Sequence, residues 1–145
     1  MEIFFDTSVL VASCAATHSH YVQAIAAVKR VVTGQDRGFL GMHSIAEMFT
    51  ALTNMPVQPR IHPTEAARII ANNILAHFKV IPLTEEDYLG AMEIMVNGGW
   101  SGAKIYDALL LRGAEKCGAE RIYTFNLNDF RQMAPARLQD RICAP

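Results

Sequence analysis

Cysteine is scarce in this chain of 145 residues. Only Cys14, Cys117 and Cys143 are present, and their odd number and wide separation argue against a disulfide framework and against zinc held by Cys-x-x-Cys pairs. Histidine gives no stronger metal signal. We interpret His18 and His20 as polar loop residues, because no second cluster follows at ligand spacing. A site that depends on sulfur or imidazole ligands is therefore not expected.

Long apolar runs are also missing, since no stretch approaches the roughly 20 residues that cross a bilayer. Met1 and Glu2 open the chain with an acid, and Asp6 interrupts the only early apolar run, which is not the pattern of a signal peptide. We therefore expect a cytoplasmic protein with no membrane partner.

An excess of charge of either sign is absent as well, because the formal net charge is -1 with 19% charged residues. A strongly basic surface, the usual mark of a nucleic-acid-binding protein, is therefore not predicted. Nucleic acid is still compatible with this balance, because a bound divalent cation offsets clustered acids and local arginines can hold phosphates.

The chain does contain a regular alternation of short apolar runs with amphipathic segments. Strands are predicted at residues 3–5, 38–42, 78–83, 120–125 and 142–143, and helices at residues 7–16, 20–32, 43–54, 63–77, 84–97 and 104–116. Residues 126–130 are predicted to form a loop. This alternation favours an α/β fold with a central, mostly parallel sheet and helices on both faces. No repeat or linker interrupts residues 1–145, so a single domain is expected.

Two acids stand where the local pattern does not require them. Asp6 directly follows the first predicted strand, where ligand sites of open α/β sheets lie, although it could equally cap the next helix. Glu47 lies on the third predicted helix, opposite an apolar stripe that includes Ile45, Phe49 and Leu52. Glu47 is a candidate site residue if this polar face lines a cleft, and otherwise the face is simply solvated.

Asp107 is the most informative acid, because its neighbours from Ile105 to Leu111 are all apolar or aromatic. A buried carboxylate without compensation costs several kcal/mol, so we expect a cation, a hydrogen-bond network or a raised pKa at this position. Lys104, three residues earlier on the same side of the helix, offers a simpler ion pair as the alternative.

Polar residues also lie at the carboxyl end of the strand predicted at 120–125 and directly after it. Thr124, Asn126 and Asp129 are candidate site residues there, or ordinary turn residues. Together with the three acids they form a set of oxygen ligands, which selects a hard cation such as Mg²⁺ or Mn²⁺. Such a centre activates water and stabilises charge on a phosphodiester, which is the chemistry of a nuclease.

Four segments match a known pattern in the same order. They are Phe5-Asp6-Thr7-Ser8-Val9-Leu10, His43-Ser44-Ile45-Ala46-Glu47, Tyr106-Asp107-Ala108-Leu109 and Thr124-Phe125-Asn126-Leu127-Asn128-Asp129-Phe130. These segments resemble the motifs of PIN-domain ribonucleases, specifically the VapC-type toxins. The resemblance extends from residue 3 to about residue 130, which is nearly the whole chain.

The resemblance implies a Rossmann-like three-layer sandwich with Mg²⁺ or Mn²⁺ held by Asp6, Glu47 and Asp107. Thr124 matches the hydroxyl residue of the family. Asn126 stands where many members of the family have an Asp. The resemblance therefore implies that Asn126 orients a water or a metal-bound ligand, and that Asp129 is a candidate for the missing carboxylate.

The resemblance also implies endonucleolytic cleavage of RNA, a homodimer, and a cognate antitoxin in a type II toxin–antitoxin pair. We expect an arginine or lysine of that antitoxin to enter near Asp6 and Asp107, because a basic side chain would replace the charge of the cation.

Two other functions are considered. An aspartyl-phosphate hydrolase would use Asp6 as the nucleophile, but the haloacid-dehalogenase pattern requires a second Asp where Ser8 stands. A catalytically inactive PIN scaffold that binds RNA or a partner protein is compatible with Asn126 in place of an acid. Metal binding and turnover distinguish this scaffold from the nuclease.

Overall fold

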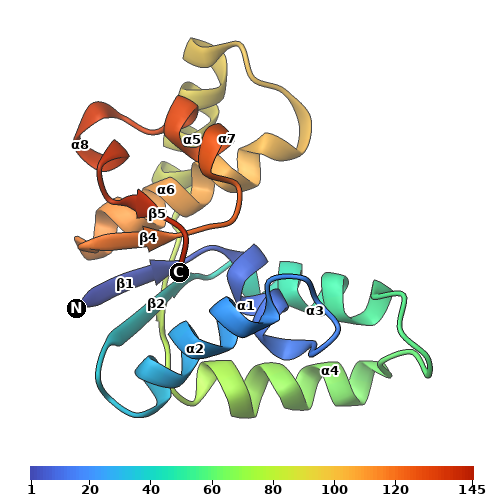
Figure 1. Ribbon diagram of the computed structural model, residues 1–145. Coiled ribbons are helices and arrows are strands. Elements are labelled where there is room, and N and C mark those ends of the chain that lie inside the picture. Colours follow the sequence, from blue (N-terminus) through green and yellow to red (C-terminus); the bar gives the residue numbers. More distant parts are fainter.

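The computed structural model describes residues 1–145 and contains one five-stranded sheet. Its strands are β1 (Glu2–Phe5), β2 (Arg37–Gly41), β3 (Lys79–Ile81), β4 (Arg121–Tyr123) and β5 (Ile142–Cys143). They lie in the order β3-β2-β1-β4-β5, and every neighbouring pair is parallel. The predicted α/β sheet is therefore confirmed (Figure 1).

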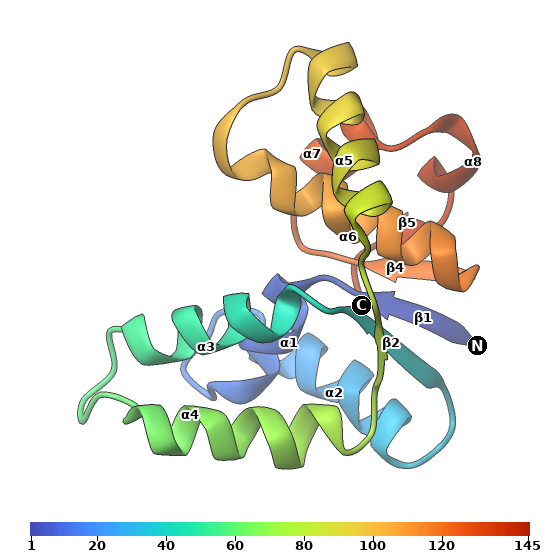
Figure 2. The ribbon, with the colours of Figure 1, turned by 180° about the vertical axis from the view of Figure 1, so that it is seen from behind.

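Helices cover both faces of this sheet. One group consists of α1 (Thr7–Cys14), α2 (Tyr21–Val32), α3 (Ser44–Asn54) and α4 (Pro63–Ile69), and the other of α5 (Glu85–Gly98), α6 (Ile105–Cys117), α7 (Leu127–Met133) and α8 (Ala136–Gln139). The two groups lie below and above the sheet in Figure 1, and the view from behind in Figure 2 shows the same separation. None of the helices combines the length and the hydropathy that a membrane span would need.

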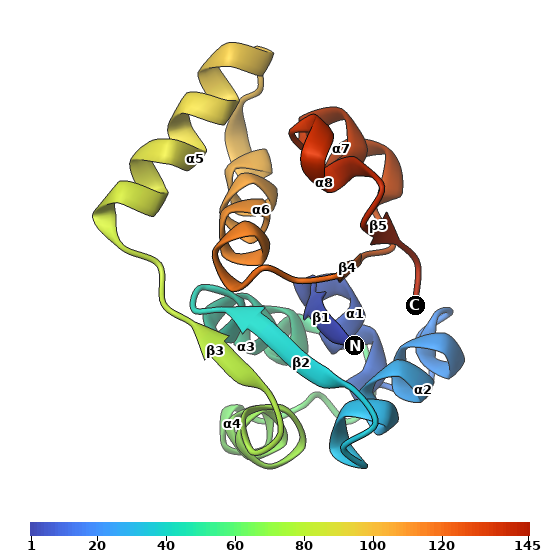
Figure 3. The same cartoon turned by 90° about the vertical axis from the view of Figure 1, so that its left-hand side faces the viewer.

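Alternation along β1 divides the core between the two faces. Ile3 and Phe5 belong to a buried cluster with α1, α2, α3 and α4, whereas Phe4 belongs to a second cluster with α5, α6, α7 and α8. Figure 3 shows the sheet between these layers from the side. Burial on both faces explains why this strand has no polar residue between Ile3 and Phe5.

Five helices begin and end within two residues of their predicted bounds, but two other segments differ. The loop predicted at 126–130 is wrong, because these residues start α7, whose Phe130 is fully buried. The helix predicted at 63–77 divides into α4 and a π-helical segment, Ile70–Leu75. The short helix α8 has no counterpart among the predicted elements.

The strand order places β1 at the centre of the sheet. From β1 the chain adds β2 and β3 on one side, then crosses back and adds β4 and β5 on the other. Sheets of this kind bind ligands at the carboxyl ends of the strands beside such a switch, which here are β1 and β4. Asp6 and Thr124 are the first residues after these two strands.

Close packing of α6 on β1 brings a further acid to this edge. A Cβ atom at Gly113 would lie 2.9 Å from Phe4 Cζ, so a larger residue here would force the Phe4 ring or the helix to shift. Asp107 lies in the first turn of α6 and faces the same edge of the sheet as Asp6.

Candidate active site

A cavity of about 390 Å³ opens at the carboxyl ends of β1 and β4, and we call it the acid pocket. Its lining combines three carboxylates with small, hydroxyl and aromatic side chains from four parts of the chain. The lining residues are Asp6, Thr7, Ser8, Val11, His18, His20, Glu47, Ala51, Asp107, Phe125 and Asn126. Three of the acids singled out in the sequence therefore face one cavity.

Asp6 is the most enclosed of these acids, with 6% of its surface exposed. Its Oδ2 accepts hydrogen bonds from Ser8 Oγ at 2.5 Å and from Thr124 Oγ1 at 2.7 Å. Asp6 occupies the N-cap position of α1, but its carboxylate is held mainly by the hydroxyl groups of Ser8 and Thr124. Burial raises the pKa of Asp6, although both hydroxyl groups act in the opposite direction.

Glu47 faces the pocket from the first turn of α3. The Thr7 hydroxyl donates to Glu47 Oε1 at 3.0 Å, and His43 Nε2 lies 3.2 Å from the same oxygen. The His43 ring is buried and stacks over Tyr106, with the ring centroids 6.2 Å apart. The interpretation of this helix face as simply solvated is therefore wrong at Glu47.

Asp107 lies in the least favourable electrostatic environment. Burial, together with repulsion by Asp6, Asp129 and Glu47, raises its pKa to about 7. Lys104, the partner in the simpler ion-pair interpretation, instead lies 3.2 Å from Asp129 Oδ2 and opposes the shift of Asp107 only weakly. Within the chain, the charge of Asp107 is therefore largely uncompensated.

Thr124 connects the two strand ends. It is fully buried, and besides donating to Asp6 its Oγ1 accepts a hydrogen bond from the backbone N–H of Asn126 at 3.0 Å. Asn126 lines the pocket, and its Nδ2 donates to Asp129 Oδ2 at 3.1 Å. Asp129 does not line the pocket, because Asn126 and Lys104 hold its carboxylate, and these contacts lower its pKa.

The acid pocket fits a divalent cation in charge and in donor chemistry. Its carboxylate and amide oxygens are the ligands that Mg²⁺ and Mn²⁺ prefer, and no Lys or Arg lines the cavity. No three His, Cys, Asp or Glu residues lie close enough together to form a compact metal-binding group. The three acids face one cavity, but their carboxylates are not close enough together to form a compact metal-binding group, as expected when carboxylates repel one another.

Aromatic residues of the pocket were not identified from the sequence. His18 and His20 line the pocket, and the His20 ring stacks on Phe125 with centroids 4.1 Å apart. Phe125 lies more than a hundred positions further along the chain. The local pattern therefore gives no signal for this contact, and only the position of Phe125 next to Thr124 associates it with the site.

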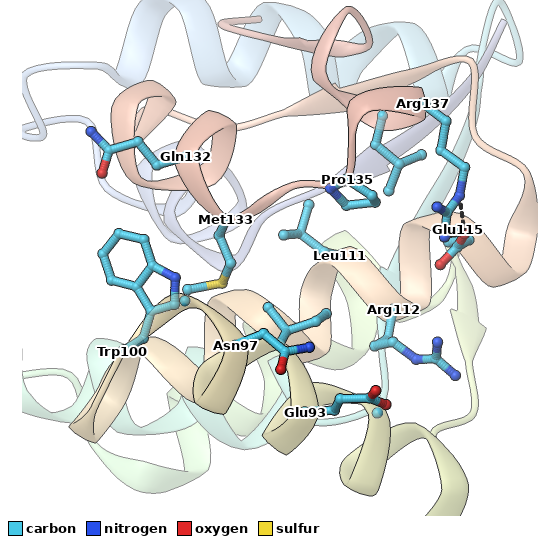
Figure 4. Close-up of a pocket in the computed structure, with 14 residues that line it drawn as sticks. Glu93, Asn97, Trp100, Leu111, Arg112, Glu115, Gln132, Met133, Pro135 and Arg137 are labelled. Carbon is cyan, nitrogen blue, oxygen red and sulfur yellow. Dashed lines mark hydrogen bonds and ion pairs between the residues drawn. The ribbon is translucent and has the colours of Figure 1, made fainter.

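A larger cavity of about 560 Å³ lies between α5, α6 and the segment α7–α8 (Figure 4). Its lining contains no histidine, cysteine or hydroxyl side chain. Arg137 Nε donates to Glu115 Oε1 at 2.5 Å, and Arg112 Nη2 lies 3.4 Å from Asp87 Oδ1, although the buried Nε of Arg112 has no hydrogen-bond partner. This cavity does not gather groups for catalysis.

An apolar groove of about 650 Å³ runs between α3 and α4 with its π-helical extension. Ile45 and Phe49, which belong to the predicted apolar stripe, line this groove, and Phe49 is 39% exposed. Met48 and Leu52 of the same helix are fully buried. The groove carries no acid, base or nucleophile, so the acid pocket is the candidate active site.

Comparison with known sequences identifies a family and a relative. The family model described as PIN domain matches residues 3–135. Ribonuclease VapC40 of Mycobacterium tuberculosis is 30% identical over 115 residues, which cover 79% of this chain and 80% of that protein.

Comparison with solved structures identifies the same architecture. VapC20 of Mycobacterium tuberculosis, a sarcin–ricin loop cleaving toxin, aligns with a TM-score of 0.67 at 23% identity over 86% of this chain and 89% of that chain. FitAcB from Neisseria gonorrhoeae aligns with a TM-score of 0.65 at 15% identity over 90% and 92%. VapBC2 from Rickettsia felis, bound to a DNA fragment from their promoter, aligns with a TM-score of 0.61 at 13% identity over 91% and 92%.

Proposed function

The chain belongs to the PIN-domain family, and from this premise we propose that it is a divalent-metal-dependent endoribonuclease and the toxin of a type II toxin–antitoxin pair. RNA is the proposed substrate, because a ribonuclease is 30% identical across most of both chains. The acid pocket is the proposed active site.

Three carboxylates that share one cavity without a basic residue are the main support for this function. They come from a strand end, from α3 and from α6, and they meet where the chain crosses back over the sheet. Burial and the neighbouring acids raise the pKa of Asp107 to about 7. Uncompensated charge of this kind costs stability and is typical of functional sites.

Each residue of the proposed site has a role that follows from its contacts. Asp6, Glu47 and Asp107 would hold Mg²⁺ or Mn²⁺, which supplies a bound water of lowered pKa and positive charge beside the phosphodiester. The hydroxyl of Thr124 keeps Asp6 oriented, and Asn126 places an amide at the wall of the pocket for a water or a phosphate oxygen.

Asp129 is a further proposed ligand. Its carboxylate is engaged by Asn126 at 3.1 Å and by Lys104 at 3.2 Å, so it would reach the pocket only by exchanging these contacts. Both partners lie at the protein surface or partly exposed, which makes such an exchange inexpensive.

An antitoxin is the proposed partner, and a homodimer in the cytoplasm the proposed state. VapC20, a toxin, and the DNA-bound VapBC2 share this fold, which supports the assignment. An arginine or lysine of the antitoxin that enters near Asp6 and Asp107 would satisfy the same negative charge as a cation. A structure of the complex with every basic side chain remote from these two acids would refute this mode of inhibition.

Cleavage of structured RNAs by the purified chain tests the function. We expect cutting with Mg²⁺ or Mn²⁺, loss of cutting with a chelator, and loss of cutting in Asp107→Asn with the fold intact by circular dichroism. The matched control is Asp140→Asn, since Asp140 is an exposed acid at the end of α8 and should be dispensable. Full activity in chelator, or in Asp107→Asn, would contradict the proposal.

An inactive scaffold is the second candidate, because Asn126 replaces an acid and Asp129 is held outside the pocket. Such a scaffold would bind RNA or a partner protein but would cut none of the RNAs tested. Metal binding without turnover, in protein freed from any antitoxin, would favour this candidate over the nuclease.

A further inference from the structure

Three aromatic rings form one wall of the acid pocket. His20 stacks on Phe125, with centroids 4.1 Å apart and ring planes inclined by 15°. His18 lies beside them, 5.9 Å from His20 and tilted by 41°. All three side chains line the same cavity as the carboxylates, and none has a role in the chemistry proposed above.

The rings come from two segments that the structure holds in place. The backbone N–H of His20 donates to His18 Nδ1 at 3.1 Å, immediately before α2 begins. Phe125 follows Thr124, the buried residue whose hydroxyl donates to Asp6. The aromatic wall therefore keeps a defined position relative to the carboxylates.

The rings remain accessible although they contact one another. His20 is exposed, and His18 and Phe125 are only partly buried. Phe125 touches the edge of a buried cluster, but His20 is not part of either cluster. An aromatic stack that served only the core would be buried, whereas this stack presents ring surface to the cavity.

The charges of the pocket favour contacts with bases over contacts with phosphates. Affinity for nucleic acid ordinarily comes largely from Lys and Arg that neutralise phosphates. The lining of this pocket contains three carboxylates and no Lys or Arg, and the whole chain has a net charge of -1. RNA binding at this site therefore needs a contribution that does not depend on phosphate charge, and stacking supplies one.

We propose that the stack of His20 on Phe125, with His18 beside it, is a platform for an unpaired nucleobase next to the phosphate that is cut. The platform presupposes the proposed nuclease and narrows its substrate class to single-stranded segments and loops, whose bases are free to stack. Since every base has an aromatic face, the platform positions the strand without reading its sequence.

Binding of two probes to purified protein tests the platform separately from cleavage. The first probe is a short fluorescent oligoadenylate, and the second is an abasic ribose–phosphate strand of the same length. In one arm, each probe is titrated into Asp107→Asn protein with metal present, because this variant should leave the RNA uncut. In the other arm, each probe is titrated into protein that retains Asp107, with a chelator present to prevent cleavage. The variants are His20→Ala, Phe125→Leu and His20→Tyr, each checked by thermal unfolding.

We expect His20→Ala to weaken oligoadenylate binding by roughly tenfold or more, which is the usual effect of losing one base–aromatic stack. The abasic strand should bind all proteins equally weakly, and His20→Tyr should retain affinity because it keeps an aromatic ring. His77→Ala is the control, because His77 is exposed just before β3 begins, at the opposite edge of the sheet.

The possible results separate the platform from the nuclease. Equal losses for oligoadenylate and abasic strand, unchanged binding by His20→Ala, or no oligoadenylate binding at all would each overturn the platform. Base-dependent binding through His20 in a protein that cuts no RNA would support the platform and refute the nuclease. Metal-dependent cutting that His20→Ala does not change at low RNA concentration would support the nuclease and refute the platform.

Discussion

At the scale of single residues, hydroxyl groups rather than lysine or arginine side chains orient Asp6 and contribute to orienting Glu47. Ser8 and Thr124 each donate to Asp6 Oδ2, and Thr7 donates to Glu47 Oε1. A hydroxyl group fixes the direction of a carboxylate but leaves its negative charge in place, whereas a lysine or arginine would cancel it. The charge therefore remains available for a divalent cation or for a basic side chain of a partner.

Thr124→Val should lower the rate of RNA cleavage by about 10- to 100-fold, the usual effect of removing a group that orients a metal ligand. The substitution keeps the shape of the side chain and removes only the hydroxyl that connects Asp6 with the backbone of Asn126. Thr124→Ser keeps that hydroxyl and should cut at nearly the normal rate. Equal cleavage rates for Thr124→Val and the unaltered protein would show that this hydroxyl has no role in the site.

At the scale of helices and strands, the sequence predicts the elements whose formation depends mainly on neighbouring residues. The helix predicted at residues 84–97 is present as α5, and Thr84 forms a capping box with Asp87 at its start. Helix α7 was mistaken for a loop, because Asn126, Asn128 and Asp129 are also common turn residues and its seven residues are too few to show a clear period. The burial of Phe130, which supports α7, depends on its packing with α6 and β5 and is not visible locally.

A buried charge cluster connects α5 with α6. Asp87 accepts hydrogen bonds from Lys116 Nζ at 2.8 Å and from the Thr84 backbone N–H at 2.9 Å, and Arg112 lies 3.4 Å away. The hydrogen bond from Lys116 and then that from Thr84 lower the pKa of Asp87 to about 2. The cluster holds the helix that carries Asp107 against its neighbour, and none of its residues lines the acid pocket.

Asp87→Asn should lower the free energy of unfolding at neutral pH by about 2 kcal/mol, since one pKa unit corresponds to about 1.4 kcal/mol. Because the pKa is lower in the folded state, this stabilisation is complete above the unfolded pKa of about 4 and is lost as pH falls toward about 2. Denaturant unfolding across that pH range should therefore show a shallower acid dependence in Asp87→Asn. Glu86→Gln, an exposed neighbour in the same turn, should unfold like the unaltered protein, and equal acid slopes for all three proteins would contradict the role of Asp87.

At the scale of the whole molecule, topology assembles a site that no single segment contains. Asp6 and Thr124 are 118 positions apart, yet parallel pairing of β1 with β4 brings them into hydrogen-bonding contact. The sequence could predict that each lies at the carboxyl end of a strand, and therefore that both lie at one edge of the sheet. It could not predict that β1 and β4 are neighbours, that Lys104 would pair with Asp129, or that His20 would meet Phe125, because these contacts follow from the strand order and the path of the loops.

The position of a bound divalent cation tests the acid pocket as a metal centre. Crystals soaked in Mn²⁺ should give an anomalous difference peak inside the pocket, within coordination distance of carboxylate oxygens of Asp6 and Asp107. Crystals of Asp107→Asn prepared in the same way should lose or strongly weaken that peak, while crystals of Asp140→Asn should retain it. A map with no peak in the pocket, or with Mn²⁺ only at acids outside it, would contradict the proposed site.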